Sequence, residues 1–398
     1  MKRYPTGNLF RPAIFLFTSE ERLSKKIFIT IPWFLPAFRA GGPIQSVANL
    51  VKEYNNDTEY YIFCSDTDLN GAALENITTN EWTHYNACTK IWYAGPERIS
   101  HMLNEQVEKI HPDVLYIIGL YDWHFNIVPL VFCKAPKKII SVRGMLHPGA
   151  LSQKRFKKKW YLQLFRLLEF HHKVIFHATD EAEAGYIRQQ FGSIAHINVA
   201  GNFPNRMEVL PVAAREAGKL RLVSIALISP MKNILLVLEA LQQVHETIDY
   251  IIYGPVKDQE YYNLCKEKIK ALPQNITVTL AGEAIPSQVS QILSQAHVFI
   301  LPSKSENFGH AIYEALSAGR PVITSEHTPW NHLEEAHAGM NVTTDDGSAL
   351  AEAIRYFANM NSLELSAWSS GAADYAARAV DLALLRKEYE RMFADGSI

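Results

Sequence analysis

Short apolar runs alternate with longer amphipathic segments along most of the chain. Runs of this length without polar interruption are typical of strands buried in a parallel sheet, and apolar positions at helical spacing indicate the helices that cover it. In the first half, the pattern predicts strands at 26–33, 60–64, 114–118 and 138–142, and helices at 44–54 and 98–110.

The same alternation restarts in the second half of the chain. The predicted strands are 220–228, 250–253, 276–281, 297–301 and 321–324, and the predicted helices are 233–246, 260–271, 287–296 and 311–317. This rhythm favours α/β domains with right-handed crossovers. A chain of 398 residues exceeds what one core usually holds, so two domains are expected.

The boundaries follow from the segments that break this rhythm. Residues 1–24 hold two prolines and only a short apolar patch, so we interpret them as an extension. The proline-containing segment 204–217 is the best linker candidate. We therefore expect an N-terminal domain over 25–205, a C-terminal domain over 206–380 and a final helix within 381–398.

The composition, 48% hydrophobic and 20% charged with a net charge of −2, is that of a soluble globular protein. Without a basic excess, nucleic acid is not expected as the main partner. The four cysteines form no C-x-x-C pair, which favours a reducing compartment and offers no metal site. No apolar run reaches the ~18 residues that span a membrane. The apolar patch near residue 15 is shorter than the about 7–15 residues of a signal peptide, so a cytoplasmic location is expected.

The stretch 302–330 reads as a strand, a polar loop, a helix and a second strand, with Glu306 in the loop and Glu314 in the helix. Eight residues in helical conformation would rise about 12 Å. Catalytic carboxyl pairs of glycoside hydrolases lie roughly 5–9.5 Å apart, so this spacing argues against hydrolysis. It suits two carboxylates that hold different hydroxyls of one long ligand.

Between these glutamates, the backbone N–H groups of Phe308, Gly309 and His310 open the predicted helix, which favours binding of a phosphate or another anion. The spacing alone leaves a second interpretation open, in which both glutamates lie on the surface of an ordinary helix.

The segment SENFGHAIYEALSAGRPVI resembles the signature of the retaining nucleotide-sugar glycosyltransferases of family four, a glutamate followed eight residues later by a second one. The resemblance covers about residues 25–360 and includes 174–191, similar to H-A-T-x-x-E-x-x-x-I, and the turn at 197–202. It implies the GT-B fold, in which two Rossmann-like domains with parallel sheets face each other across a cleft. It also implies that the last helix crosses back to the first domain.

The resemblance implies a role for each matching residue. Glu306 would be catalytic and, with the backbone of Asn307, Phe308 and Gly309, would bind the donor sugar, while Glu314 would bind the ribose. Gly282 and Glu283 are also assigned to donor binding on this basis.

The predicted diphosphate clamp departs from the family pattern G-R-L-x-x-x-K. The chain reads A-L-I-S-P-M-K, which keeps the lysine as Lys232 but places Leu227 where the arginine is usual. One missing charge-assisted contact would cost roughly 1.5–3 kcal/mol. Arg143, at the end of the fourth strand of the facing domain, is a candidate replacement, and we assign Lys232 and Arg143 to catalysis.

Gly41 and Gly42 precede a predicted helix, and adjacent glycines there allow close approach of an anion or a sugar. An ordinary tight turn would carry the same pair. In the family, a glycine-rich loop at this place borders the acceptor and the donor phosphates.

A basic segment with interleaved aromatic residues lies at 152–166. It is either the solvated face of a helix or a surface attracted to anionic lipid headgroups or to the diphosphate of a lipid-linked acceptor. Its charged residues are Lys154, Arg155, Lys157, Lys158 and Lys159.

The predicted function is transfer of a sugar from a nucleotide-sugar to an acceptor hydroxyl with retention, in the assembly of a bacterial cell-surface polysaccharide or lipopolysaccharide. By resemblance, no metal or other cofactor is needed, the acceptor is a sugar or lipid-linked sugar, and the enzyme is cytoplasmic or peripheral on the membrane. The alternatives are a nucleotide-sugar-binding protein with little or no turnover, and a GT-B epimerase or phosphorylase.

Overall fold

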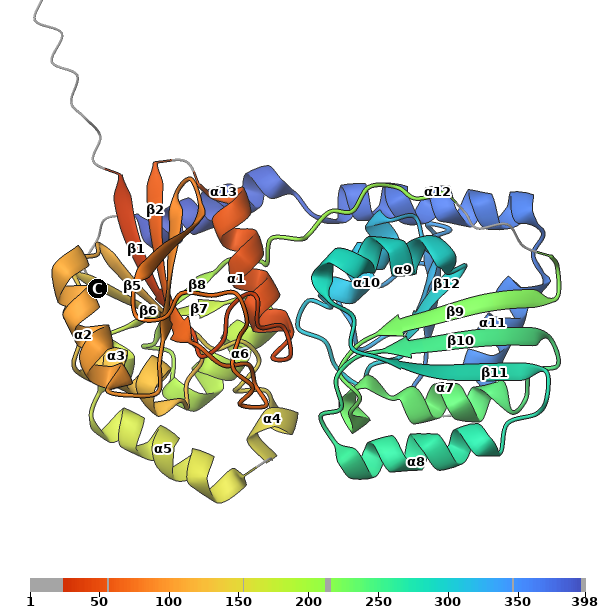
Figure 1. The fold of residues 1–398 in the computed structure, drawn as a ribbon, viewed down its shortest axis with the longest axis horizontal. Helices are drawn as coiled ribbons and strands as arrows, with labels where there is room; N and C mark the ends of the chain where they lie inside the picture. The colour runs from red at the N-terminus through yellow and green to blue at the C-terminus, as the bar shows by residue number, and fades with distance from the viewer. Residues whose placement is uncertain (1–23, 56, 153, 212–215, 346, 395–398) are drawn as a thin grey trace, which may run out of the picture.

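A computed structural model of the chain describes residues 24–55, 57–152, 154–211, 216–345 and 347–394. The predicted extension, 1–24, lies outside these residues except for Ser24, whose hydroxyl donates a hydrogen bond to Glu59. Figure 1 shows two α/β units side by side, each built around its own sheet.

The N-terminal sheet has eight strands in the order β3-β4-β2-β1-β5-β6-β7-β8. Its pairs are parallel except for β3 against β4. The strands are β1 Lys25–Thr30, β2 Thr58–Ser65, β3 Trp82–Asn86, β4 Thr89–Ala94, β5 Val114–Ile118, β6 Lys137–Ser141, β7 Ile175–Ala178 and β8 His196–Val199.

Helices cover both faces of this sheet, which explains why central strands such as β5, VLYII, are buried along their whole length. The helices of this unit are α1 Gly42–Glu53, α2 Ile99–Ile110, α3 Val128–Val131, α4 Pro148–Ser152, α5 Arg155–Leu167 and α6 Glu181–Phe191.

The C-terminal sheet has six strands in the order β11-β10-β9-β12-β13-β14, all parallel. The strands are β9 Lys219–Ile225, β10 Thr247–Tyr253, β11 Ile276–Gly282, β12 Val298–Leu301, β13 Val322–Ser325 and β14 Gly339–Val342. The helices around it are α7 Ile234–Leu241, α8 Gln259–Lys270, α9 Val289–Gln295, α10 His310–Ser317, α11 Gly347–Asn359 and α12 Ser362–Ala379.

The last helix, α13 Leu382–Phe393, leaves the C-terminal unit and packs on the N-terminal one (Figure 1). Its apolar face, Leu385, Tyr389, Met392 and Phe393, belongs to the same buried cluster as residues of β1, β2 and α1. The Nζ of Lys137 donates to the carbonyl of Ala394 over 2.9 Å, which fixes the end of this helix.

The predicted fold class is confirmed: two α/β units with mainly parallel sheets face each other. The hairpin β3–β4 was not predicted, because β3, WTHYN, is largely exposed and lacks a clear apolar alternation. The short strand β14 was also missed. The helix predicted over 233–246 ends at Leu241, and the strand predicted over 220–228 ends at Ile225, so Leu227 lies in a loop.

Replacing Tyr389 of α13 by alanine should destabilise the N-terminal unit. The side chain is 1% exposed and its ring lies 5.1 Å from that of Phe203. We expect a loss of about 3–5 kcal/mol in the free energy of unfolding, measured by chemical denaturation. The matched control is Leu384→Ala on the exposed face of the same helix. Equal effects of the two substitutions would contradict the packing described here.

Candidate functional site

A cavity of about 480 Å³ lies between the two units. It opens at the carboxyl ends of the strands of both sheets, where open α/β sheets bind ligands. Most of the predicted site residues line it, namely Gly41, Gly42, Arg143, Lys232, Glu306, Asn307, Phe308, Gly309 and Glu314.

Glu306 and Lys232 form an ion pair inside this cavity. The distance from Nζ of Lys232 to Oε1 of Glu306 is 2.5 Å, and the hydroxyl of Ser303 donates to the same oxygen over 2.7 Å. Lys232 follows β9 in the short turn Pro230–Lys232, and Glu306 follows β12. An anion that enters the cavity could therefore contact Lys232, whose ammonium group is already oriented by Glu306.

The loop between Glu306 and α10 is held from behind by Trp330. Its indole N–H donates to the carbonyl of Phe308 over 2.6 Å, and the two rings contact edge to face at 5.2 Å. Gly309 caps α10 with φ of 75°, and a side chain there would lie 3.2 Å from Ile312 and from Trp330. Gly309 therefore permits the turn that brings the helix N-terminus to the cavity.

Asn307 connects this loop to the N-terminal unit. Its side-chain oxygen accepts hydrogen bonds from the hydroxyl of Thr179 over 2.9 Å and from the amide of Asn202 over 3.3 Å. The buried carboxylate of Glu183 accepts a hydrogen bond from the backbone N–H of Thr179 over 2.8 Å and lies 2.9 Å from the Thr179 hydroxyl, whose single proton is shared between Glu183 and Asn307. The two units are thus joined by a polar network beside the cavity.

Glu314 lies in α10, one side of which lines the cavity. Burial raises the pKa of its carboxyl to about 7, although the hydrogen bond from Asn205, 3.0 Å long, acts in the opposite direction. The carboxyl is therefore partly protonated near pH 7. A ligand hydroxyl that donates a hydrogen bond would favour the ionised form.

The loop before α1 brings Gly41 and Gly42 to the opposite wall of the cavity. Gly41 is the N-cap of α1 with φ of 71°, and a side chain there would approach Leu227 of the facing unit to 4.0 Å. One turn further, the hydroxyl of Ser46 lies 3.0 Å from Nε2 of His310. Burial, together with the charge of Arg143, lowers the pKa of His310 to about 3, so this imidazole is neutral.

Arg143 follows β6 and adopts a left-handed conformation with φ of 48°. Its guanidinium donates hydrogen bonds to the side-chain oxygen of Asn202 and, over 3.2 Å, to the hydroxyl of Tyr116. Its Nε is buried and has no hydrogen-bond partner among the described residues. Leu227, where the family pattern has an arginine, also lines the cavity.

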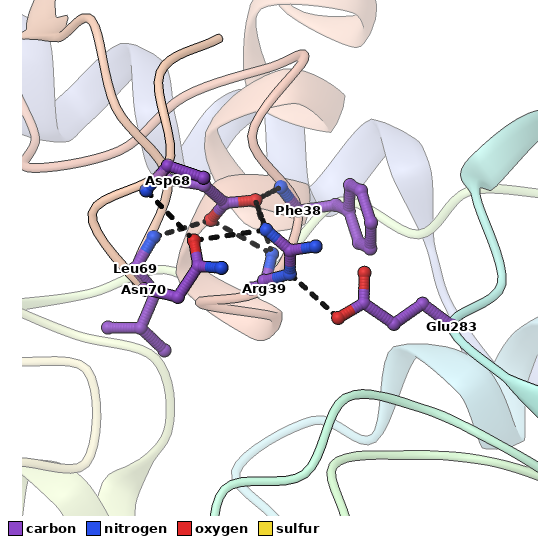
Figure 2. A network of polar contacts seen from close by, with 7 residues as sticks. Phe38, Arg39, Asp68, Leu69, Asn70 and Glu283 are labelled. Carbon is purple, nitrogen blue, oxygen red and sulfur yellow. Dashed lines mark hydrogen bonds and ion pairs between the residues drawn. The ribbon is translucent and has the colours of Figure 1, made fainter.

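Gly282 and Glu283, predicted to bind the donor, do not line the cavity, although Ala284 does. Glu283 instead forms an ion pair with Arg39 of the N-terminal unit, with Nε 2.7 Å from Oε1. Figure 2 shows Arg39 between Glu283 and the Asp68–Asn70 turn. Asp68 accepts hydrogen bonds from the backbone of Phe38 and Arg39, both over 3.3 Å, and orients this loop. The prediction for Gly282 and Glu283 rested on the family resemblance alone, and neither residue is part of the cavity wall.

The predicted basic residues lie at the start of α5, away from the cavity. Lys154, Arg155, Lys157 and Lys159 are exposed, whereas Lys158 folds inward, with Nζ 2.5 Å from the carbonyl of Ala150 and above the ring of Tyr121. Beside them, four large apolar side chains project into solvent on the same helix: Phe156, Trp160, Leu164 and Leu167. The sequence analysis noted the interleaved aromatic residues but did not predict an exposed apolar surface, because exposure depends on which face of α5 packs against the domain.

Within the described ranges, no group of three or more histidine, cysteine or acidic residues could hold a metal ion. The described helices also include none that is both long and apolar enough to cross a bilayer.

Comparison with known proteins identifies the second unit. Residues 207–373 match the model of the family described as glycosyl transferases group 1. The matched residues make up most of the C-terminal unit. This family was predicted from the sequence, and the match contains Lys232, Glu306 and Glu314.

Similar proteins extend the comparison. Over 116 residues, the chain is 33% identical to the alpha-monoglucosyldiacylglycerol synthase of Streptococcus pneumoniae, a match that covers 29% of this chain and 26% of that relative. The structure resembles Anabaena HepE in complex with UDP and glucose, with a TM-score of 0.67 and 16% sequence identity. The match covers 94% of this chain and 100% of HepE. It also resembles WaaG, a glycosyltransferase involved in lipopolysaccharide biosynthesis, with a TM-score of 0.62 and 12% identity over 93% and 100% of the two chains. The likeness to these structures shows the fold.

The site also contains residues that the sequence analysis did not select. Ser46, Asn202 and Asn205 line the cavity, and Thr179 contacts Asn307 from the N-terminal side. The segments that resemble the family at 174–191 and 197–202 contain Thr179 and Asn202, so this signal could have found them. Ser46 and Asn205 carry no comparable pattern.

Because the pKa of Glu314 is raised in the folded protein, we expect the free energy of unfolding to depend on pH. Its carboxyl has an ordinary pKa of 4.5 and a folded-state pKa of about 7. Between these values the unfolded chain releases a proton that the folded protein retains, so stability falls as pH rises, by up to about 1.4 kcal/mol per pH unit. The change is complete above the folded-state pKa.

Glu314→Gln cannot ionise and should gain stability relative to the wild type as the pH rises from 4.5 to 7. Urea titrations at several pH values measure this difference. Glu334→Gln, at an exposed position, is the control and should track the wild type. Parallel curves for the wild type and Glu314→Gln would contradict the burial of this carboxyl.

Proposed function

We propose that the protein transfers a sugar from a nucleotide-sugar donor to an acceptor hydroxyl with retention of anomeric configuration. The observation that carries this proposal is the cavity between the two units, in which Glu306, Lys232 and the N-terminus of α10 converge within a group 1 domain. The arrangement offers cationic and backbone N–H groups for a diphosphate and carboxylates for hydroxyls.

The donor would lie along the C-terminal wall. Its ribose hydroxyls would contact Glu314, its diphosphate Lys232 and the first N–H groups of α10, and its sugar hydroxyls Glu306 and the backbone of 307–309. HepE, which resembles this chain in fold, was crystallised with UDP and glucose, and this makes UDP-sugars the first donors to test. The raised pKa of Glu314 fits such a ligand, because ribose hydroxyls can donate hydrogen bonds to the carboxylate.

Catalysis would be mainly electrostatic. As the bond between the anomeric carbon and the phosphate oxygen breaks, Lys232 and the helix N-terminus stabilise the negative charge on the leaving diphosphate. The acceptor oxygen bonds to the anomeric carbon from the same face, and its proton passes to the leaving phosphate oxygen. The ion pair with Glu306 orients Lys232 in advance, so that little reorganisation is needed in the reaction.

The acceptor would be linked to a lipid. The exposed Phe156 and Trp160 on α5 stand beside Lys157 and Lys159, a combination that binds the interface of an anionic membrane. The relative in Streptococcus pneumoniae is named for a glycolipid product, and WaaG for lipopolysaccharide biosynthesis. These names support assembly of a lipopolysaccharide or another cell-surface polysaccharide at a membrane surface.

One observation favours a second candidate, a protein that binds nucleotide-sugars with little turnover. Leu227 replaces the arginine of the family's phosphate clamp, which would leave the diphosphate with one cation fewer from this domain. Binding of a nucleotide-sugar without transfer to any acceptor and without hydrolysis would favour this alternative.

Lys232→Ala should lower kcat about 10- to 100-fold or more, because a charge-assisted contact to the leaving diphosphate is lost. Glu314→Ala should act mainly on KM for the donor, since the ribose contact is the same in the ground state and the transition state. Donors are first found by thermal shift against a panel of nucleotide-sugars, and product configuration is read by NMR.

The matched control is Lys270→Ala on the exposed face of α8, which should retain wild-type kinetics. A donor whose binding and turnover survive both Lys232→Ala and Glu314→Ala would refute this placement. An inverted product would refute retention.

Replacing Lys154, Lys157 and Lys159 together by serine should weaken binding to vesicles that contain phosphatidylglycerol, by about 1 kcal/mol per lysine at low salt. Phe156→Ser with Trp160→Ser should weaken binding at all salt concentrations, because these side chains would enter the interface. Sedimentation of vesicles with the protein measures both. The control replaces the exposed Lys257, Lys266 and Lys270 of the C-terminal unit, and equal loss there would argue against a specific α5 surface.

A further inference from the structure

The cavity wall lacks a cation at the end of β9. Leu227 occupies that place, and its side chain faces Gly41 of the other unit. Among the lysines and arginines that line the cavity, Lys232 is paired with Glu306 and Lys52 is exposed on α1. Arg143 is the remaining one.

Arg143 is held in place by neutral groups. Asn202 and Tyr116 accept its hydrogen bonds, and it forms no ion pair with a carboxylate in the part of the chain that the structure describes. Glu183, the nearby acid, is engaged by the backbone N–H groups of Gly144 and Thr179. A partly buried cation without a carboxylate partner is costly, and its cost falls when an anion binds beside it.

Arg143 and His310 line the same cavity. Asn202 links Arg143 to the loop before α10, since it accepts a hydrogen bond from Arg143 and donates one to Asn307. The charge of Arg143 acts on His310, the first residue of that helix, and the Nδ1 of His310 is buried without a hydrogen-bond partner among the described residues. The Nε of Arg143 is likewise buried and unpartnered. Two residues from different units, each with a buried nitrogen that lacks a hydrogen-bond partner among the described residues, thus line the cavity together with the helix N-terminus, which itself favours anions.

We propose that Arg143 supplies the second positive charge of the donor diphosphate clamp, in place of an arginine at position 227, so that the clamp is completed across the boundary between the two domains. This inference rests on the proposed function. Lys232 and the N-terminus of α10 hold the diphosphate from the C-terminal side, and Arg143 reaches it from the N-terminal side.

Placing the second cation on the N-terminal domain would couple completion of the diphosphate clamp to domain closure. With both cations on one domain, the clamp is complete whether the domains are open or closed. With Arg143 on the facing domain, it is complete only when Asn307 contacts Thr179 and Asn202, as in this structure. Stabilisation of the leaving group is then coupled to closure, which also excludes water that would hydrolyse the donor.

The test compares nucleoside diphosphates with the matching monophosphates, using the uridine, thymidine, adenosine and guanosine series so that the base need not be known. Arg143→Gln should weaken the affinity for the preferred diphosphate about 10- to 100-fold, measured by calorimetry, because one charge-assisted contact is lost. Affinity for the monophosphate, which lacks the second phosphate, should stay within about two-fold of the wild type. The control, Arg188→Gln, removes an exposed arginine from α6 and should change neither value.

Rescue provides the second arm. Leu227→Arg returns a cation to the end of β9. In the Arg143→Gln background it should raise both the diphosphate affinity and kcat at least ten-fold above the values of Arg143→Gln alone. The gain must exceed the effect of Leu227→Arg in the wild type, as a double-mutant cycle requires. If Arg143→Gln does not fold, Arg143→Lys replaces it. Lysine keeps the charge but not the planar fork, and we expect a smaller loss, again specific to the diphosphate.

The outcomes distinguish a wrong role for Arg143 from a wrong assignment of the transferase function. Equal loss of monophosphate and diphosphate affinity, or no loss of either, would overturn the role of Arg143 and leave the proposed transferase intact. Failure of Leu227→Arg to rescue a folded Arg143→Gln protein would also overturn it. A wild-type protein that binds no nucleoside diphosphate would refute both the proposed function and this inference.

Discussion

The hydrogen bonds that Asn307 accepts from Thr179 and Asn202 are the contact on which the site depends. They join the loop that carries Glu306 to the opposite unit and so set the separation of the two cavity walls beside Glu306. The donors are themselves held: Glu183 accepts hydrogen bonds from Thr179, and Arg143 donates one to Asn202. Because the network is partly buried, each missing member would leave a polar group unsatisfied, which favours one closed arrangement.

The electrostatics of the cavity follow from this closed arrangement. Burial keeps His310 neutral and raises the pKa of Glu314 to about 7, so that its carboxyl is only partly ionised near neutral pH, and Glu306 neutralises Lys232. Arg143 is therefore the charge that is least compensated. A cavity with this balance attracts a polyanion, whereas an apolar or cationic ligand would gain little from it. The raised pKa of Glu314 reduces the negative charge on this wall near pH 7.

The connection between the units is covalent as well as polar. The chain crosses the boundary once after β8 and again before α13, whose aromatic side chains complete the N-terminal core. The Arg39–Glu283 ion pair adds a third bridge near the mouth of the cavity, but both side chains are about one-quarter to one-third exposed, at 26% and 30%. Exposed pairs contribute little stability, so this bridge can break as the domains open, whereas the packing of α13 persists.

The fold class and the two-unit organisation were predictable from the linear pattern of residues, as were the positions of Glu306 in a loop and Glu314 in the helix that follows. Strand burial follows from apolar runs, and the helix start at Gly309 follows from local backbone requirements, so both are visible in a linear pattern. The sequence also identified Leu227 as a departure. Only the tertiary structure decided which groups face one another: that Glu306 pairs with Lys232, that Glu283 turns to Arg39 and away from the cavity, and that Arg143 stands opposite the N-terminus of α10. Contacts between residues far apart in the chain depend on how two rigid units meet, and no local preference encodes that geometry.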